Sequence, residues 1–241
     1  MPNPTAAMLV IGDEILSGRT RDANMYYLAG SLTEAGIDLR EVRVVSDSKA
    51  AIVTAVQALS EAYDYVFTSG GIGPTHDDIT ADCIAAAFGR AIDIRADARA
   101  LLEAHYANSG LELNAARLRM ARIPDGATLI DNPVSVAPGF VIENVHVMAG
   151  VPSVFKAMVA SVLPLLSGGA PLISRTLKVD RGEGDIAGPL SDLAGKYPDL
   201  SMGSYPFQKK SGAYGSNIVI RGSDAAAVRS AMDELSKLLS A

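Results

Sequence analysis

The chain has 241 residues, of which 49% are hydrophobic and 20% charged, a balance typical of folded globular proteins and unlike disordered, collagen-like or coiled-coil chains. At roughly 150 residues per domain, this length allows one large domain or a full domain with a small companion. The formal net charge of −6 argues against general nucleic-acid binding, because affinity for phosphate backbones comes mainly from clustered Lys and Arg.

The cysteine content and the hydropathy pattern indicate in which cell compartment the protein is expected. Cys83 is the single cysteine, so neither an internal disulfide nor a Cys-rich zinc site is available. The longest uncharged stretch lies between Lys156 and Arg175, and prolines and glycines interrupt it, so it does not predict a membrane helix. The N-terminus has no basic region and reaches Asp13 and Glu14 too early for a secretory signal. We therefore expect a cytoplasmic protein with no membrane or nucleic-acid partner.

The first half of the chain alternates predicted strands and helices. Apolar runs that end at glycine or at polar residues indicate buried strands, and apolar residues spaced by three and four indicate helices. In chain order these are a strand (7–11), a helix (25–35), a strand (42–44), a helix (48–63), a strand (65–68) and a helix (79–87).

This order predicts an α/β fold with a mostly parallel sheet that helices cover on both faces. Ligands of such folds bind beyond the carboxyl ends of the strands. Three polar segments, residues 12–18, 46–48 and 69–80, each follow a predicted strand. We expect them to converge at one edge of the sheet.

The second half of the chain contains a predicted boundary. Residues 97–121 predict one or two helices, residues 145–149 a strand, and residues 152–166 a helix that begins with proline. A glycine-rich segment, 167–171, is a candidate linker, and beyond it the pattern is strand, helix, strand, strand, helix. We therefore expect two domains: an α/β domain over residues 1–166 and a small α+β domain over residues 172–241.

The strongest chemical signal is the segment SGGIGPTHDDIT, residues 69–80, between a predicted strand and a predicted helix. Glycines let backbone N–H groups approach an anion closely, and the helix N-terminus adds positive potential. The spacing matches neither the Walker pattern nor the dinucleotide fingerprint. The segment therefore predicts a site for phosphate or carboxylate, and the alternative is a tight turn in which Asp77 or Asp78 caps the helix.

Carboxylates gather around this loop in the predicted fold. Asp77 and Asp78 stand beside the expected phosphate, which is electrostatically unfavourable unless a cation lies between them. Asp13, Glu14 and Asp47 follow other strands at the same edge and supply further oxygen ligands. We therefore expect a hard divalent ion such as Mg²⁺, and the alternative is that all five are solvated loop acids.

Three segments resemble a known family in order and spacing: GDEILSGRTRDAN (12–24), TSGGIGPTHDDIT (68–80), and NPVSVAPGF (132–140) followed by AGVPS (149–153). They are similar to the molybdopterin-binding domain of the competence/damage-inducible CinA family, over about residues 7–165. The resemblance extends more weakly to molybdenum-cofactor biosynthesis proteins of the MogA and MoaB type. It implies a three-layer α/β/α sandwich for the first domain.

The resemblance also implies roles for individual residues. Asp78 would be the catalytic acid of the loop, and Asp47 its catalytic partner from a neighbouring strand end. The positions that the resemblance implies for binding substrate or phosphate are Gly70, Gly71, Gly73, Ser17, Asn24, Gly150 and Ser153. Thr75 and His76 are expected to join them because they lie inside the glycine-rich loop, and the alternative for His76 is a role that does not face the substrate. The positions expected to hold the metal are Asp78, Asp47, Asp13 and Glu14.

Two activities are associated with the families that the chain resembles. CinA-type domains are associated with metal-dependent hydrolysis of the pyrophosphate in ADP-ribose, and the MogA branch activates molybdopterin by adenylylation. We therefore expect a divalent-metal-dependent pyrophosphatase acting on ADP-ribose-like nucleotides. The alternatives are a molybdopterin adenylyltransferase and a non-catalytic module that binds a pterin or a nucleotide. Relatives are commonly dimers or trimers, so we expect a homo-oligomer.

Overall fold

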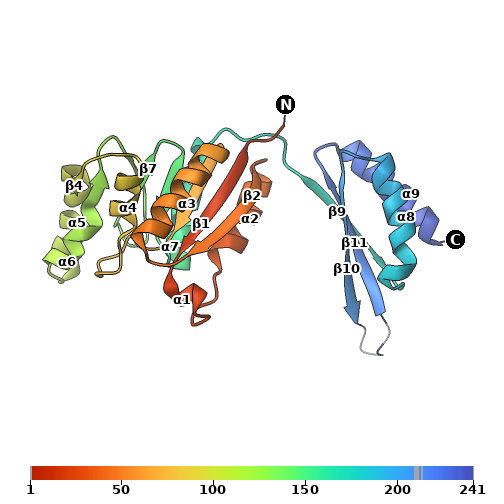
Figure 1. The fold of residues 1–241 in the computed structure, drawn as a ribbon, viewed down its shortest axis with the longest axis horizontal. Coiled ribbons are helices and arrows are strands. Elements are labelled where there is room, and N and C mark those ends of the chain that lie inside the picture. The colour runs from red at the N-terminus through yellow and green to blue at the C-terminus, as the bar shows by residue number, and fades with distance from the viewer. Residues whose placement is uncertain (1, 209–211, 213, 241) are drawn as a thin grey trace. The chain divides into compact units, whose positions relative to one another are not determined.

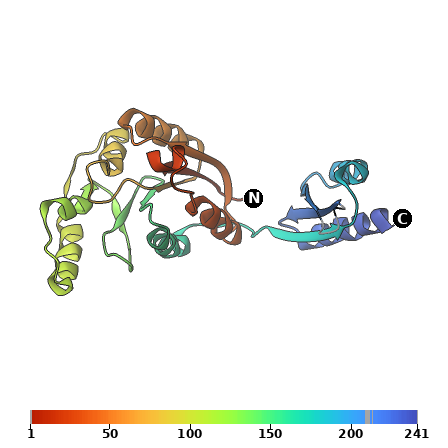
Figure 2. The same ribbon diagram turned by 90° about the horizontal axis from the view of Figure 1, so that it is seen from below.

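The computed structural model describes residues 2–208, 212 and 214–240, and it divides the chain into two compact units (Figures 1 and 2). The first unit is Met1–Gly169 and the second is Ala170–Ala241. Each unit has its own sheet and its own hydrophobic core.

A six-stranded sheet in the order β2-β1-β3-β8-β7-β6 forms the centre of the first unit. The first four strands in that order are parallel, and β7 and β6 extend the sheet in antiparallel fashion. The strands are β1 (Thr5–Ile11), β2 (Asp38–Val45), β3 (Tyr65–Ser69), β6 (Thr128–Ile130), β7 (Gly139–Ile142) and β8 (Val145–Met148), with a separate antiparallel pair of β4 (Ile92–Ile94) and β5 (Arg122–Pro124).

Helices cover both faces of this sheet. The α-helices are α1 (Asp13–Leu16), α2 (Asn24–Glu34), α3 (Lys49–Ala62), α4 (Thr80–Ala87), α5 (Ala96–Ser109), α6 (Ala115–Leu118) and α7 (Pro152–Val162), and the 3₁₀ helices are η1 (Arg119–Ala121) and η2 (Leu163–Leu165). Helices α2 and α7 belong to one core, and α3, α4 and α5 belong to the other. The predicted three-layer α/β fold with a mostly parallel sheet is therefore confirmed.

Strand β1 connects the two cores of the first unit. Its side chains alternate between the two faces, as those of any strand do, so Met8 packs with the α2/α7 core and Leu9 with the α3/α4 core. Residues 6–11 are all buried, which is typical of a central strand in a parallel sheet.

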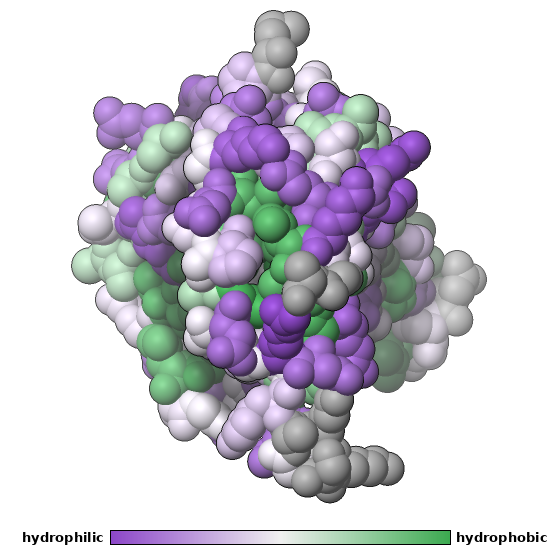
Figure 3. Space-filling view, turned by 90° about the vertical axis from the view of Figure 1, so that its right-hand side faces the viewer, coloured by the Kyte–Doolittle hydropathy of each residue, from purple (hydrophilic) through white to green (hydrophobic). Residues whose placement is uncertain are grey.

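The second unit is a three-stranded antiparallel sheet, in the order β10-β11-β9, packed against two helices. Its elements are β9 (Ile173–Val179), α8 (Glu183–Lys196), β10 (Ser201–Gln208), β11 (Tyr214–Gly222) and α9 (Ala225–Ser240). Ile218 and Ile220 of β11 pack with Val228 and Leu235 of α9. On the face of the molecule that Figure 3 shows, hydrophilic side chains border an apolar area. Among the described residues, no helix is both long and apolar enough to cross a membrane.

Because the cores of the two units share no residue, each unit should unfold as its own cooperative transition. Leu9 and Ile218 are fully buried in the first and the second unit. We expect Leu9→Ala and Ile218→Ala each to cost about 2 to 5 kcal/mol, and only in the unit that carries the substitution. Calorimetry combined with hydrogen exchange measures this, and a single transition shifted equally by both variants would contradict it.

Candidate functional site

The carboxyl ends of the parallel strands meet beside a cavity of about 490 Å³, a size within the usual range of ligand pockets. Backbone hydrogen bonds join these ends: the Gly12 amide donates to Val45 O (3.1 Å) and the Gly70 amide to Met148 O (3.1 Å). Residues that follow β1, β2, β3 and β8 all line the cavity. The predicted convergence of polar segments at one sheet edge is therefore confirmed.

The glycine-rich loop after β3 is held by its own side chains. Thr80, the first residue of α4, donates from Oγ1 to Gly70 O (3.0 Å) and from its amide to Gly71 O (2.9 Å). Asp78 Oδ2 accepts from both the amide (2.8 Å) and the hydroxyl (2.5 Å) of Thr75. These bonds fix the loop, and none of them uses the backbone amides of residues 71–73.

Three successive amides of this loop, those of Gly71, Ile72 and Gly73, have no hydrogen-bond partner among the residues that the structure describes. All three residues line the cavity. Backbone N–H groups that succeed one another in a glycine-rich turn form anion-binding concavities. These amides can therefore donate hydrogen bonds to the oxygens of a phosphate.

Carboxylates line the same cavity, namely Glu14, Asp47, Asp77 and Asp78. Burial raises the pKa of Asp47, and the negative charges of Asp13, Glu14 and Asp77 raise it further. The Asp13 amide, which donates to Asp47 Oδ2 (2.9 Å), offsets part of this rise in the pKa. A positive charge placed beside Asp47 would relieve the repulsion.

Two of these carboxylates could contribute to a metal site only together with oxygens of a bound ligand. In the described part of the chain, no three His, Cys, Asp or Glu side chains lie close enough together to hold a metal ion. Mg²⁺ usually binds one or two carboxylates together with phosphate oxygens, and keeps several waters. Asp47 and Asp78, which line one cavity with the open amides of the loop, match that set of ligands.

The residues predicted for the site fall into two groups. Those that line the 490 Å³ cavity are Gly70, Gly71, Gly73, Asp78, Asp47, Glu14 and Gly150. Among the described residues predicted for the site, those outside its lining are Asp13, Ser17, Asn24, Thr75, His76 and Ser153. Thr75 instead braces Asp78, and the side chain of His76 is 99% exposed. Asn24 lines a smaller neighbouring cavity.

Several lining residues were not predicted from the sequence. Asn132 and Ser135 lie in the NPVSVAPGF segment, where the Asn132 side chain accepts from the amides of Val134 (3.1 Å) and Ser135 (3.2 Å) and shapes the loop. The resemblance of that segment was the available signal. Val154, which is buried, adds an apolar wall.

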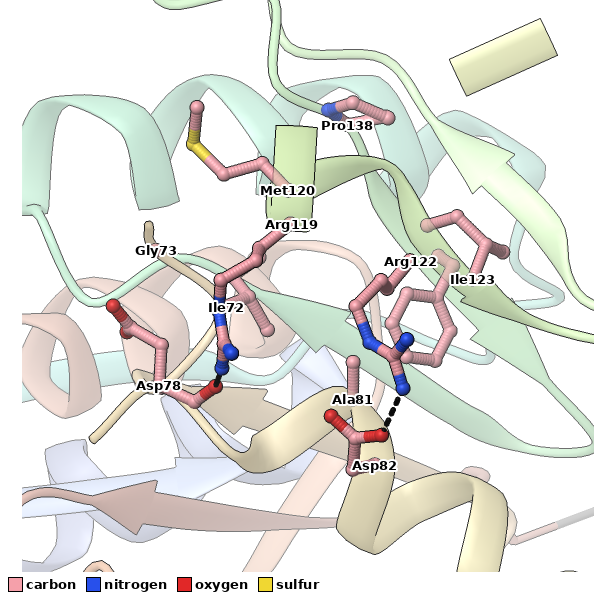
Figure 4. A pocket seen from close by; sticks show the side chains of 12 residues that line it. Ile72, Gly73, Asp78, Ala81, Asp82, Arg119, Met120, Arg122, Ile123 and Pro138 are labelled. Atoms are coloured by element: carbon pink, nitrogen blue, oxygen red, sulfur yellow. Dashed lines mark hydrogen bonds and ion pairs between the residues drawn. The ribbon is translucent and has the colours of Figure 1, made fainter. Parts of the chain in front are cut away.

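A cationic side chain contacts the glycine-rich loop. Arg119 of η1 donates from Nη2 to the backbone oxygen of Asp78 (3.3 Å), and the nearby Arg122 is paired with Asp82 (Figure 4). These residues line a second cavity of about 20 Å³, enough for one water, which shares Gly71, Gly73 and Asp78 with the larger cavity. Nothing in the sequence near Arg119 indicates this position.

Two family models match the chain, one for each unit. A model described as a probable molybdopterin binding domain matches residues 7–168, and one described as the middle domain of FAD synthase matches residues 171–241. A crystal structure of the protein CinA, of unknown function, from Thermoplasma acidophilum is similar with a TM-score of 0.61 and 35% identity. It covers 66% of this chain and 95% of that one.

Relatives similar to both units include a protein of Archaeoglobus fulgidus and a probable FAD synthase of Caenorhabditis elegans. The first is 34% identical over 200 residues, which cover 83% of this chain and 84% of that protein. The second is 36% identical over 228 residues, which cover 84% of this chain and 44% of that protein. The chain thus spans less than half the length of the C. elegans relative.

Gly71 is required for the shape of the loop. Its φ is +70°, and an added Cβ would lie 2.1 Å from Thr80 Oγ1, whereas Gly18 has a φ of +72° and open space around it. Gly18→Ala should cost about 1 to 2 kcal/mol for the left-handed backbone alone, and Gly71→Ala should cost more. The double variant Gly71→Ala/Thr80→Ala should be more stable than the sum of its single changes predicts, by about 0.5 to 3 kcal/mol. Denaturant unfolding measures all four, and strict additivity would contradict the clash.

The pKa of Asp47 makes a prediction about stability. Because this pKa is raised in the folded state, ionisation of Asp47 destabilises the fold. The cost is absent below the ordinary carboxyl pKa of about 3.9, and grows as the pH rises through the raised value. Without metal, Asp47→Asn should therefore gain stability over the native protein between pH 3 and pH 7, while the exposed Asp125→Asn should not. If the difference in unfolding free energy between Asp47→Asn and the native protein were the same at pH 3 and pH 7, that would contradict this prediction.

Proposed function

Since the chain belongs to the family of molybdopterin-binding domains, here joined to a domain of the FAD synthase middle type, we propose that it is a divalent-metal-dependent pyrophosphatase. Its substrates would be nucleotides in which ADP is linked to a sugar, with ADP-ribose as the simplest example. The observation that carries this proposal is the row of open amides at Gly71, Ile72 and Gly73 in a cavity that also holds four carboxylates.

The open amides bind the pyrophosphate in this proposal. They lie at the N-terminal side of α4, whose dipole adds to the attraction for an anion. Because the loop is already braced by Thr80 and Asp78, its donors need no reorganisation as charge builds on the phosphoryl oxygens. The loop is therefore suited to stabilise a transition state as well as to bind its ligand.

The carboxylates supply the remaining chemistry. Asp47 and Asp78 would hold the divalent ion, which when bound polarises the phosphoryl oxygens and neutralises their charge. A water oxygen attacks one phosphorus, the bridging P–O bond breaks, and the leaving phosphate takes that bond's electron pair. In this proposal one of these aspartates would orient the water and accept the proton that it loses. With ADP-ribose the products are AMP and ribose 5-phosphate.

FAD is a second substrate to test. It also contains ADP, joined through a pyrophosphate to a sugar-like chain, and both the second family model and the C. elegans relative carry FAD synthase in their descriptions. Hydrolysis of the same bond would give AMP and FMN. The coarser conclusion, a small-molecule nucleotide or pterin ligand, follows from the family itself.

Asp78→Asn tests this proposal. Asn keeps an oxygen that can accept from Thr75, so the melting temperature should change little. Metal-dependent turnover of ADP-ribose should fall by about 10²-fold or more, as expected for loss of a ligand to the ion that polarises the phosphoryl oxygens. The assay measures release of AMP with Mg²⁺, Mn²⁺ or Co²⁺, and Asp125→Asn is the matched control.

The same assay separates the alternatives. Adenylyl transfer would appear as consumption of ATP only when molybdopterin is added. A binding module would retain nucleotide in calorimetry with no turnover of any substrate. Equal nucleotide affinity with and without metal in the native protein would contradict the metal-bridged site.

A further inference from the structure

Strand β2 lies at one end of the six-stranded sheet (Figure 1). It pairs with β1 along one side, and among the residues that the structure describes no strand pairs with its other side. The pairing with β1 is regular from Glu41 to Val45, after an irregularity between Leu39 and Glu41. A regular, free strand edge is a template on which another strand can pair.

Two residues of this regular stretch turn their backbone groups away from β1. The Gly12 amide, directly after β1, donates to Val45 O, so the backbone groups of Val45 face β1. Because the direction of these groups alternates from residue to residue along a strand, those of Val44 and Val42 face outward. No other described segment forms a hydrogen bond with them. The edge therefore offers two N–H donors and two carbonyl acceptors to an added strand.

The side chains of the same two residues are apolar and partly open to solvent. Val42 is 38% exposed and Val44 is 40% exposed. They pair with Met8 and Val10 of β1, which belong to the α2/α7 core, and paired residues of a sheet share a face. The apolar row thus continues from that core to the free edge, where an added strand would cover it.

Opposite charges stand two residues apart on the other face of this edge. Arg43 donates from Nε to Glu41 Oε1 (2.5 Å), and the Tyr63 hydroxyl donates to Glu41 Oε2 (2.8 Å). Lysines and other charges often guard a free edge against pairing. A glutamate and an arginine at this spacing act differently, because they complement an antiparallel copy of the same strand.

We propose that β2 pairs in antiparallel fashion with β2 of a second copy of this chain, with the two-fold axis at Val42. In this register the two Val42 residues exchange their outward hydrogen bonds, and Glu41 of each copy lies opposite Arg43 of the other. An axis at Arg43 would instead place two arginines opposite each other. The contact is isologous, so it closes as a dimer, and it joins the two sheets into one.

The choice of a second copy follows from the charges, because the strand is complementary to itself. This inference does not depend on the proposed function, since it uses no residue of the cavity and needs no ligand. It can therefore fail or hold while the pyrophosphatase proposal stands.

Charge reversal at this edge tests the register. Sedimentation velocity of the native protein over a range of concentrations should show a dimer. Glu41→Arg and Arg43→Glu each place like charges opposite each other, and each should raise the dissociation constant of the dimer by about tenfold or more. Arg99→Glu, which breaks the exposed Arg99–Glu103 pair of α5, is the matched control and should leave that constant unchanged.

Mixing the two variants gives the sharpest result. In an equimolar mixture of Glu41→Arg and Arg43→Glu, position 41 of each copy faces an opposite charge at position 43 of the other. The mixture should therefore form a heterodimer at concentrations where each variant alone is monomeric. Formation of the heterodimer also shows that both variants are folded.

Val42→Pro tests the backbone contact. Proline removes the outward N–H of Val42, which β1 does not use, and proline is tolerated on an edge strand. The variant should keep the fold of the first unit and weaken the dimer.

Four outcomes would overturn the proposal. One is a native protein that stays monomeric at every concentration, and another is a dimer that none of these changes weakens. A mixture of the two charge variants that stays monomeric while the native protein dimerises would exclude this register. Slow hydrogen exchange of the Val42 amide in a monomer would show that another part of the chain covers the edge.

Discussion

The central position of strand β1 is the constraint on which the site depends. This strand pairs in parallel with β2 on one edge and β3 on the other, and it contributes side chains to both cores of the first unit. Its pairing brings Gly12, Asp47 and Gly70 to one edge of the sheet, although they are far apart along the chain. The place of the cavity, the position of the loop and the grouping of the carboxylates therefore all follow from how the strands of this sheet pair.

The site that results contains an electrostatic conflict. Three open amides favour an anion, while Asp47 and its neighbouring carboxylates repel one. Burial raises the pKa of Asp47, and the neighbouring carboxylates raise it further. Buried or crowded charges of this kind destabilise a fold and tend to be kept where they serve a ligand. A phosphate and a divalent ion bound together satisfy both sets of groups, which is why we favour a shared ligand over either alone.

The two units differ in how they use their polar residues. In the first, loops after four neighbouring strands line one cavity, and two buried asparagines, Asn24 and Asn132, hold such loops in place. In the described part of the second, Ser216 is the buried polar residue, and its hydroxyl donates to the backbone oxygen of Arg181. The chemistry that we propose accordingly lies in the molybdopterin-binding domain.

The sequence by itself determined the α/β class, the convergence of three loops and the glycine-rich loop, because hydrophobic period, strand ends and glycine spacing are local properties. The short strands β4 to β7 were not predicted, since three or four residues carry too little periodicity. Only the tertiary structure shows that Arg119 donates to the backbone oxygen of Asp78, and that His76 and Ser17 lie outside the cavity lining. It alone joined Asn24 to Gly150 across 126 positions, because hydrogen bonds between distant segments depend on the packing of the whole sheet.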